Sequence, residues 1–507
     1  MNNLDKKKSK QILTSKMPFR SLMEPLLVVF NKAVSDAFSD KPYYISYSIP
    51  GGVYGYFKDY ELKGEDEKII TNQLKKLIKE NLCFQQEFLS REKIIRYFHS
   101  KKRPDITKLL HSHDFTEYNI DNMYLARLNG NAELFFNHIN ENYEKLEKFR
   151  FFKFNKGFFL IADPAFYERV MSKRLEISKY LKRFDESAES MKQLGISSFS
   201  QLNEVIDNGE LSEFIKISEA FQAKSIGRIA DNIVSHPQKP RLIFLAGPTS
   251  SGKTTSANRL AIELKVLGKK VLMLSLDNYY LPHSMIPFDP HSGLQNFELI
   301  SALDLNLFRN TIQQLLNGES VHLPRYRFDG MGAIPDPNAT IITPDTFIIV
   351  EGIHGLNPDL WQNTMDVDSY RLYVSALNTL NIHDHLPMST SDHRLIRRLV
   401  RDHLFRGYSF SDTINRWPDV MENEYHSIFP FQESAHAIFN SALIYEIAVF
   451  AHYAPGILKP SDSENEDVKQ QVLRLNRILS LLNPINPKDI PPTSILREFI
   501  GGSSFVY

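Results

Sequence analysis

The sequence predicts an α/β protein in which helices flank a parallel sheet, and this unit is preceded by a smaller α+β domain. The first observation concerns residues 238–456, where short apolar runs alternate with helical patterns, as expected of parallel strands joined by covering helices. The second concerns residues 17–170, where helix-like and strand-like patterns are mixed. A length of 507 residues allows several domains, each with its own core.

Composition excludes several classes of protein. Lys plus Arg and Asp plus Glu total 60 each, so no net charge favours nucleic acid or an anionic membrane. The single cysteine, Cys83, excludes an intrachain disulfide framework and a Cys-rich zinc site. No stretch approaches the roughly 20 apolar residues of a membrane span, and the polar, basic start lacks the apolar core of a secretory signal. We therefore expect a cytoplasmic protein without a strong nucleic-acid signal, and its oligomeric state stays open, a homo-oligomer included.

The chain divides into five predicted segments. A charged, helix-favouring stretch follows the α+β domain. The polar loop "SHPQKP" marks the end of this stretch. A second polar stretch, "KPSDSENEDVKQ", separates the α/β domain from a last helix. The segments are a flexible tail (1–16), the α+β domain (17–170), a helical connector (171–237), the α/β domain (238–456), and a C-terminal helix and tail (457–507).

The α+β domain contains clear local patterns. Apolar residues recur at helical spacing in residues 17–38, and residues 65–82 predict a second helix. Residues 42–57 predict two strands joined at "PGG". In residues 148–164, aromatic and basic residues alternate before a turn, which predicts a half-buried strand with solvated lysines. The alternative is a surface on which bases stack.

The stretch "LIFLAGPTSSGKTTSANRL" carries the most informative motif of the chain. Residues 247–254 fit the phosphate-loop pattern G-x-x-x-x-G-K-[ST], between a predicted strand and a predicted helix. Two glycines let the backbone curl, so that successive N–H groups face anionic oxygens at a helix N-terminus. Lys253 is expected to bridge the β- and γ-phosphates, and Thr254 to ligate Mg²⁺. The predicted nucleotide-binding residues are Gly247, Ser250, Ser251, Gly252, Lys253, Thr254 and Thr255.

Acidic residues follow two later strands of the α/β domain. The strand in "KKVLMLSLDNYYLP" is followed by Asp277, and ligands bind beyond the carboxyl ends of such strands. Asp277 is therefore placed to accept a proton from an attacking hydroxyl. The strand in "DTFIIVEGIHGL" ends at Glu351, which is expected to hold Mg²⁺ or its waters. A structural role is expected for the nearby His354.

A predicted helix in "DHRLIRRLVRDHLFRGYS" is rich in arginine. Arg394, Arg398 and Arg401 fall at positions i, i+4 and i+7 and share one stripe. A stripe that leads to Arg406 and a glycine suits a lid that closes over transferring phosphates. The alternative is a solvated helix face. We expect catalytic roles for Arg398, Arg401 and Arg406, together with Lys253 and Asp277.

Five motifs in order, "LDNYY", "FELISALD", "LPRYRF", "VEGIHGL" and "RRLVRD", resemble the uridine kinase and phosphoribulokinase family of P-loop kinases. The resemblance extends over residues 238–450 and implies a P-loop NTPase fold, ATP and Mg²⁺ as cofactors, and Asp277 as the base for the acceptor hydroxyl. It implies that a nucleoside is surrounded by Tyr280, Tyr326 and Phe328, with its ribose hydroxyls held by Glu298, and that the lid arginines are Arg398, Arg401 and Arg406.

The sequence departs from the family where the base is recognised. Met331 stands in place of a histidine that reads the base, and Tyr408 in place of an arginine after the lid glycine. Arg416 stands near the place of a base-contacting glutamine. The phosphate-binding motifs are intact while base recognition is altered, so another small alcohol stays an alternative to uridine or cytidine.

The N-terminal domain resembles the additional domain that precedes the catalytic core of threonyl-tRNA synthetases. The stretches "PGGVYGYF" and "FFLIADP" carry this resemblance. The editing pocket of that family uses an H-x-x-x-H pair, and the matching positions are Arg20 and Glu24, so zinc binding and tRNA editing are not expected. The whole layout, with "RWPDV", "FPFQE", "FNSAL" and "SILREFIGGS", resembles a branch of fused uridine kinase-like proteins.

These observations predict an ATP-dependent kinase that transfers the γ-phosphate to a hydroxyl of a small molecule, in first place the 5′-hydroxyl of a nucleoside such as uridine. One alternative is a kinase for a sugar phosphate-like acceptor. The other is a nucleotide-gated protein that binds RNA or protein without nucleoside turnover. The histidine pairs in residues 111–113 and 383–385 are expected to be polar loop residues and not metal ligands.

Overall fold

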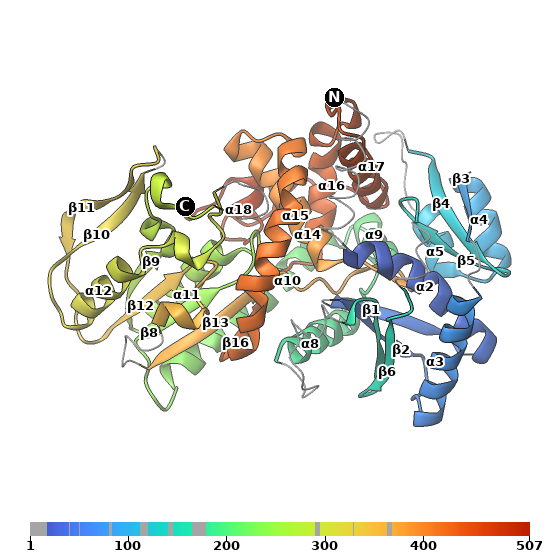
Figure 1. The fold of residues 1–507 in the computed structure, drawn as a ribbon, viewed down its shortest axis with the longest axis horizontal. Coiled ribbons are helices and arrows are strands. Elements are labelled where there is room, and N and C mark those ends of the chain that lie inside the picture. The colour runs from blue at the N-terminus through green and yellow to red at the C-terminus, as the bar shows by residue number, and fades with distance from the viewer. Residues whose placement is uncertain are drawn as a thin grey trace.

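Two regions make up the fold (Figure 1): an N-terminal α+β region with antiparallel sheets, and a P-loop region with a parallel sheet. They lie toward opposite ends of the long axis, with the C-terminal helices between them. This architecture confirms the predicted fold class. The computed structural model describes residues 18–39, 41–49, 51–80, 84–111, 120–139, 146–164, 179–288, 295–327, 329–361 and 368–506.

The N-terminal region packs two antiparallel sheets, of order β1-β2-β7-β6 and β3-β4-β5, around α2. Because successive side chains on a strand point to opposite faces, alternating apolar residues bury one face of each sheet against this helix. The strands are β1 (Tyr43–Ile49), β2 (Gly52–Phe57), β3 (Gln85–Ser90), β4 (Asn122–Leu128), β5 (Asn131–Phe135), β6 (Arg150–Phe154) and β7 (Gly157–Ile161), and the helices are α2 (Pro18–Ala37), α3 (Gly64–Lys79), α4 (Arg91–Ser100) and α5 (Pro104–His111).

The elements predicted for this region are confirmed. The two predicted helices are α2 and α3, and the strands predicted around "PGG" are β1 and β2. The alternating aromatic and basic stretch forms the hairpin β6–β7, in which Phe151 and Phe158 are buried in the core beside Phe30. The half-buried strand is therefore the correct interpretation of this pattern, and these aromatic rings are not an open stacking surface.

Helices also form in the predicted connector: α8 (Lys179–Gln193), α9 (Phe199–Asp207) and α10 (Leu211–Val234). Apolar side chains of α9 and α10, such as Leu202 and Ile226, lie in the same core as the strands of the parallel sheet. From residue 179 onward, the segment is therefore packed against the P-loop region and is not a free linker.

The P-loop region is organised around a five-stranded sheet of order β16-β13-β8-β12-β9, in which all neighbours are parallel. The central strand is wholly buried, as expected of a sheet covered on both faces. The strands are β8 (Leu242–Ala246), β9 (Lys270–Ser275), β12 (Thr346–Glu351), β13 (Ser369–Ser375) and β16 (Ala437–Asn440), and the helices are α11 (Lys253–Val266), α12 (Leu305–Leu316), α13 (Pro358–Trp361), α14 (Thr390–Arg401), α15 (Phe410–Ser427) and α16 (Glu446–Ile457).

Two hairpins project from this region. One pairs β10 (Val321–Arg327) with β11 (Gly332–Thr340), and the other pairs β14 (Asn381–His383) with β15 (Leu386–Pro387). Figure 1 shows the first hairpin at the end of the molecule farthest from the N-terminal region. Within the described ranges, every helix is too short or too polar to cross a lipid bilayer.

The chain ends with α17 (Glu466–Leu479) and the short α18 (Arg497–Ile500). The side chains of Ile495, Leu496 and Phe499 are fully buried in the core of the P-loop region. The residues after α17 therefore fold back onto this region, because their apolar side chains are removed from water there.

A buried polar cluster joins the two regions. It consists of Arg103, Asp105, Glu133 and His385. Arg103 Nη2 lies 2.7 Å from Asp105 Oδ2, and its Nη1 lies 3.1 Å from Glu133 Oε1. His385, from the β14–β15 hairpin, places its Nδ1 2.5 Å from the same Glu133 oxygen, and its ring stacks on Tyr43 with centroids 4.1 Å apart. This hairpin is therefore anchored in the N-terminal region.

The prediction of a polar loop residue is wrong for His383, which ends β14, whereas His385 does lie in the turn of the hairpin. His383 is buried, its Nε2 lies 3.2 Å from the Leu134 carbonyl oxygen, and burial lowers its pKa to about 4. The reason is tertiary, since the hairpin that carries both histidines is covered by the N-terminal region. His111 contacts the Thr107 carbonyl oxygen within its own helix, and His113 lies outside the described residues.

Asp384, at the turn of this hairpin, gives a test of the contact. Burial and the nearby Asp105 raise its pKa from 3.8 to about 6. The folded protein therefore holds this proton more tightly than the unfolded chain, and the corresponding stability is lost as pH rises from about 4 to 6. Since asparagine does not ionise, we expect Asp384→Asn to stabilise the protein by roughly 1–2 kcal/mol at pH 7, allowing for partial solvent screening, and by nothing near pH 4.

Thermal unfolding of both proteins between pH 4 and 7.5 measures this difference. Asp489→Asn, at an exposed carboxylate, is the control and is expected to show no comparable dependence on pH. A constant difference between Asp384→Asn and the unmodified protein across this range would contradict the prediction.

Candidate active site

The phosphate loop connects β8 to α11 and depends on two glycines. A Cβ on Gly247 would lie 2.0 Å from the Val374 carbonyl oxygen, so no side chain fits there. Gly252 has φ of +79°, a left-handed conformation that L side chains rarely adopt. The loop therefore curls as its motif predicts, and α11 begins directly after it, at Lys253.

The polar groups of the loop fit an anionic ligand. The hydroxyls of Ser250 and Ser251 are buried without a hydrogen-bond partner among the described residues. Lys253 Nζ is held over the loop by the Pro248 carbonyl oxygen, 3.2 Å away. Unpaired donors, a lysine and the N-terminus of a 14-residue helix together favour phosphate oxygens. The donor set thus fits the polyphosphate of a nucleotide.

The two acidic residues lie together because β9 and β12 are neighbours in register, with Ser275 opposite Glu351. Ser275 Oγ donates to Glu351 Oε1 at 3.0 Å. Burial, and then the charge of Asp277, raise the pKa of Glu351 to about 7. Asp277 follows in the short turn after β9, where its side chain remains accessible to solvent.

Opposing effects act on the Asp277 carboxyl. Surrounding protein raises its pKa, while the cations of Lys253 and Arg406 lower it. The Asp277 carboxyl therefore lies within electrostatic reach of both the phosphate loop and the arginine-rich turn. His354, which follows nearby, is buried, and burial lowers its pKa to about 4, so its imidazole is neutral at pH 7.

Aromatic side chains gather near Asp277, whose charge adds to the burial that raises the pKa of Tyr280. The rings of Tyr280 and Tyr326 meet edge to face with centroids 5.9 Å apart. Tyr280 Oη donates to the Phe297 carbonyl oxygen at 3.0 Å, and the Phe297 ring lies beside it. The sequence did not single out Phe297, although it stands in the "FELISALD" motif. Phe328 lies outside the described residues.

Glu298 joins this group. Burial raises its pKa, and the nearby cations of Arg398 and Lys253 lower it. The structure thus brings Glu298 close to Asp277, to the phosphate loop and to α14, as expected of a site where an acceptor meets a phosphate.

Asp402 lies at the centre of the predicted lid arginines. Arg398 Nε donates to its Oδ2 at 3.2 Å, and Arg401 Nη2 donates to its Oδ1 at 2.8 Å. Arg406 is more exposed, and its Nε lies 3.8 Å from the same Oδ1. One buried carboxylate thus holds three cations together, a role that the sequence pattern did not reveal.

Arg394 does not belong to this arginine group, although the helical spacing placed it on the same stripe. Its guanidinium is buried against Glu424 of α15, with N–O distances of 2.6 and 2.8 Å. Glu424 also accepts the Thr249 backbone N–H at 2.8 Å. Arg394 and Glu424 therefore brace the first half of the phosphate loop, because α15 packs over that end of α14.

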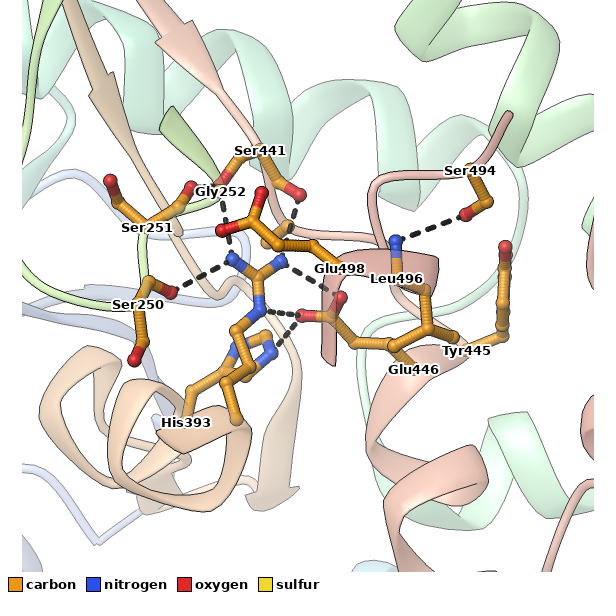
Figure 2. A network of polar contacts seen from close by, with 12 residues as sticks. Ser250, Ser251, Gly252, His393, Ser441, Tyr445, Glu446, Ser494, Leu496 and Glu498 are labelled. Atoms are coloured by element: carbon orange, nitrogen blue, oxygen red, sulfur yellow. Dashed lines mark hydrogen bonds and ion pairs between the residues drawn. The ribbon is translucent and has the colours of Figure 1, made fainter. Parts of the chain in front are cut away.

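Arg397 braces the second half of the loop, and Figure 2 labels its partners Ser250, Ser441 and Glu446. Its guanidinium is fully buried and bonds to both oxygens of Glu446, at 2.8 and 3.1 Å. It also donates to the carbonyl oxygens of Ser250 and Ser441, at 3.3 and 2.9 Å. His393 pairs with the same glutamate. Arg394 and Arg397 are thus structural, whereas the three arginines predicted for the lid gather around Asp402.

Glu498 of α18 also reaches the loop. Its Oε2 accepts the backbone N–H of Thr255 at 3.1 Å and the Thr255 hydroxyl at 2.6 Å. The sequence carried no sign of this contact, which joins residues 243 positions apart. Among the described residues, no group of three or more His, Cys, Asp or Glu side chains is arranged to hold a metal ion.

The neighbouring residues Arg397 and Arg398 give a matched pair of variants. Arg397→Met removes the main cation from the buried Glu446, so we expect a loss of about 3–5 kcal/mol in the free energy of unfolding. Arg398→Met removes one of three partners of Asp402, and we expect a loss below about 1 kcal/mol with reduced turnover. Urea or thermal unfolding of the two variants measures the difference, and equal losses would contradict these assignments.

Comparison with known proteins agrees with this geometry. Residues 242–448 match the model of the phosphoribulokinase / uridine kinase family. A uridine kinase of Bacillus pumilus is 32% identical over 183 residues, which are 36% of this chain and 77% of that protein. A uridine kinase of Lactobacillus helveticus is 30% identical over 190 residues, 37% of this chain and 80% of that protein.

A solved structure described as a possible uridine kinase from Bacillus stearothermophilus is 17% identical. The match covers 43% of this chain and 98% of that chain, with a TM-score of 0.27. The chain belongs to the phosphoribulokinase / uridine kinase family, and its residues 242–448 form an ATP-using kinase domain for a small-molecule substrate.

Proposed function

We propose that this protein is a nucleoside kinase that transfers the γ-phosphate of ATP to the 5′-hydroxyl of a nucleoside, uridine in first place. The observation that carries this proposal is the position of Asp277. It lies within electrostatic reach of Lys253 on the phosphate side and of Glu298 on the aromatic side. An acceptor between the aromatic rings and the loop would meet this carboxylate.

The phosphate loop would bind ATP through its backbone N–H groups, the serine hydroxyls and Lys253. The acceptor hydroxyl oxygen then attacks the γ-phosphorus, and the bond between this phosphorus and the β–γ bridging oxygen breaks. ADP leaves, and the hydroxyl proton passes to Asp277. Surrounding protein raises the pKa of Asp277, and the cations of Lys253 and Arg406 oppose that rise and favour the ionised form that this transfer needs.

Thr254 and Glu351 would hold Mg²⁺. Thr254 stands in the first turn of α11, and Glu351 is a buried carboxylate at the end of a neighbouring strand. Oxygen donors of this kind suit a hard divalent cation. When bound, Mg²⁺ would neutralise charge on the β- and γ-phosphate oxygens.

Arg398, Arg401 and Arg406 would close over the transferring group. The three cations repel one another, and the negative charge of Asp402 keeps them close together. Guanidinium groups so placed stabilise negative charge that develops on the phosphoryl oxygens and exclude water from the site.

Three features support a nucleoside as acceptor. The aromatic rings of Tyr280, Phe297 and Tyr326 offer flat apolar faces, and Glu298 offers a carboxylate that can accept hydrogen bonds from ribose hydroxyls. The curated relatives are named as uridine kinases. Met331, which stands in place of the family's base-reading histidine, is 72% exposed. Base recognition by this protein would therefore rest on other groups.

A phosphorylated acceptor finds less support. It would call for free basic residues near the aromatic rings, yet Arg325 and Arg327 on β10 are paired with Asp336 and Asp329. These ion pairs offset the positive charge that would attract an acceptor phosphate.

For the N-terminal region we propose a supporting role without editing chemistry. Glu24, at the position of an editing histidine, accepts from Asn137 Nδ2 at 2.8 Å and lies 4.0 Å from Arg474 of α17. Arg474 in turn donates to both oxygens of Asp392 in α14, at 2.8 and 3.2 Å. Through Arg474, the N-terminal region would thus stabilise the first turn of α14, the helix that carries Arg398 and Arg401.

Asp277→Asn tests the kinase proposal. We expect nucleoside-dependent ADP production to fall at least about 100-fold, because the amide cannot take the hydroxyl proton, while ATP binding is kept. ADP release is measured with ATP, Mg²⁺ and a panel of nucleosides. Asp345→Asn is the control, and its activity should be unchanged. Asp345 is exposed and lies just before β12, at the amino end of the strand and away from Glu351. Full turnover by Asp277→Asn, or turnover that needs no nucleoside, would refute the proposal.

Glu351→Gln tests the proposed magnesium site. The loss of one anionic oxygen is expected to raise the Mg²⁺ concentration for half-maximal turnover about tenfold. The measurement is a Mg²⁺ titration of ADP production at saturating ATP, with the same control variant. An unchanged titration midpoint would remove Glu351 from the metal site.

A further inference from the structure

The C-terminal segment, residues 487–502, folds back onto the phosphate loop, and Figure 2 shows its Glu498 near Gly252 of the loop. Ile495 lies against the loop, with its Cγ2 3.1 Å from the place that a Cβ on Gly252 would take. Leu496 and Phe499 are fully buried, so this segment is held in place by apolar contacts.

Glu498 is the residue of this segment that reaches the loop's donors. One carboxylate oxygen accepts both the backbone N–H and the hydroxyl of Thr255, at 3.1 and 2.6 Å. A backbone N–H carries a single proton, so a second anion cannot take it while Glu498 remains there. Thr255 lies in the first turn of α11, where the helix dipole favours an anion. Glu498 therefore stands where a phosphate oxygen would stand.

The segment also touches the lid side of the site. The guanidinium of Arg397 lies over the Phe499 ring, 4.8 Å from its centroid. A Cβ on Gly501 would come within 2.7 Å of the Phe405 ring, in the turn that carries Arg406. Contacts to the loop and to the lid turn thus come from one short segment.

We propose that the C-terminal segment is an internal competitor for the nucleotide, with Glu498 occupying the two donors of Thr255 that a nucleotide phosphate uses. The inference rests on the proposed function, in which Thr255 is a nucleotide contact. Binding of ATP displaces the carboxylate, because the donors are shared and because like charges repel. Glu498 thereby sets the affinity for the nucleotide.

The rest of the segment does not depend on Glu498. Arg497 Nη2 donates to the carbonyl oxygens of Pro487 and Ile490, at 2.9 and 2.5 Å, and its Nη1 donates to that of Gly501 at 3.2 Å. The buried apolar side chains on either side of Glu498 supply the remaining anchor. The carboxylate can therefore leave Thr255 while the segment stays folded.

Glu498→Gln and Glu498→Ala test the proposal in the full chain. The first keeps the shape and removes the charge, and the second removes the competing group. We expect both to bind ATP more tightly than the unmodified protein, by about tenfold for Glu498→Ala, since two hydrogen bonds to a charged group no longer compete. ATP binding is measured by calorimetry with Mg²⁺ and without any acceptor. Asp489→Asn removes an exposed charge from the same segment and should leave the affinity unchanged.

A second variant tests where the gained affinity arises. Lys253→Met combined with Glu498→Ala should abolish the gained affinity, because the loop lysine is then no longer there to bind the nucleotide phosphates. Equal or weaker ATP binding by both Glu498 variants would overturn the competitor. Absence of ATP binding in every folded variant would overturn both the competitor proposal and the kinase proposal. Tighter binding without turnover of any nucleoside would support the competitor and refute the nucleoside kinase.

Discussion

Two buried arginine–glutamate pairs hold the phosphate loop, and the rest of the site depends on that loop. Arg394 and Glu424 fix its first half through the Thr249 N–H, and Arg397 and Glu446 fix its second half through a backbone carbonyl. Buried charges of this kind are costly unless they are paired and hydrogen-bonded, and each pair here makes several hydrogen bonds. Holding the loop in one curled shape costs conformational entropy, and the contacts of the two pairs offset that cost.

Helix α14 has two functions that its sequence does not separate. Arg394 and Arg397 point into the protein and brace the loop, while Arg398 and Arg401 join the carboxylate of Asp402 on the site side. The helix thus links the shape of the phosphate loop to the position of the lid cations. Arg474 and the N-terminal region fix the other end of this helix through Asp392.

Electrostatic balance explains how several carboxylates share one site. Surrounding protein raises the pKa of Asp277, Glu298 and Glu351 by limiting their hydration, and nearby cations from Lys253 and the predicted lid oppose that rise. Removal of one cation would shift several carboxylates toward their neutral forms. Chemistry at this site is thus linked to the loop lysine and to the lid, as phosphoryl transfer requires.

The sequence by itself determined the parallel sheet, the phosphate loop and the order of acidic strand ends, because these follow from local periodicity and from short motifs with fixed backbone needs. It also predicted that Asp277 and Glu351 would lie close together, since carboxyl ends of parallel strands share one edge. Glu298 was predicted for the same site only by resemblance to the kinase family, and the lid arginines by that resemblance and by their helical spacing. Only the tertiary structure decided which arginines pair with Glu424 and Glu446 and which with Asp402. Helical spacing shows which residues share a face of the helix, but not what that face contacts.

The tertiary structure alone also placed Glu498 on Thr255 and the histidine-bearing hairpin in the N-terminal region. These contacts join segments that are 243 and 252 residues apart, and no local pattern encodes such pairings. They form because apolar side chains near them are buried, which brings polar groups together that have no signal of their own in the sequence.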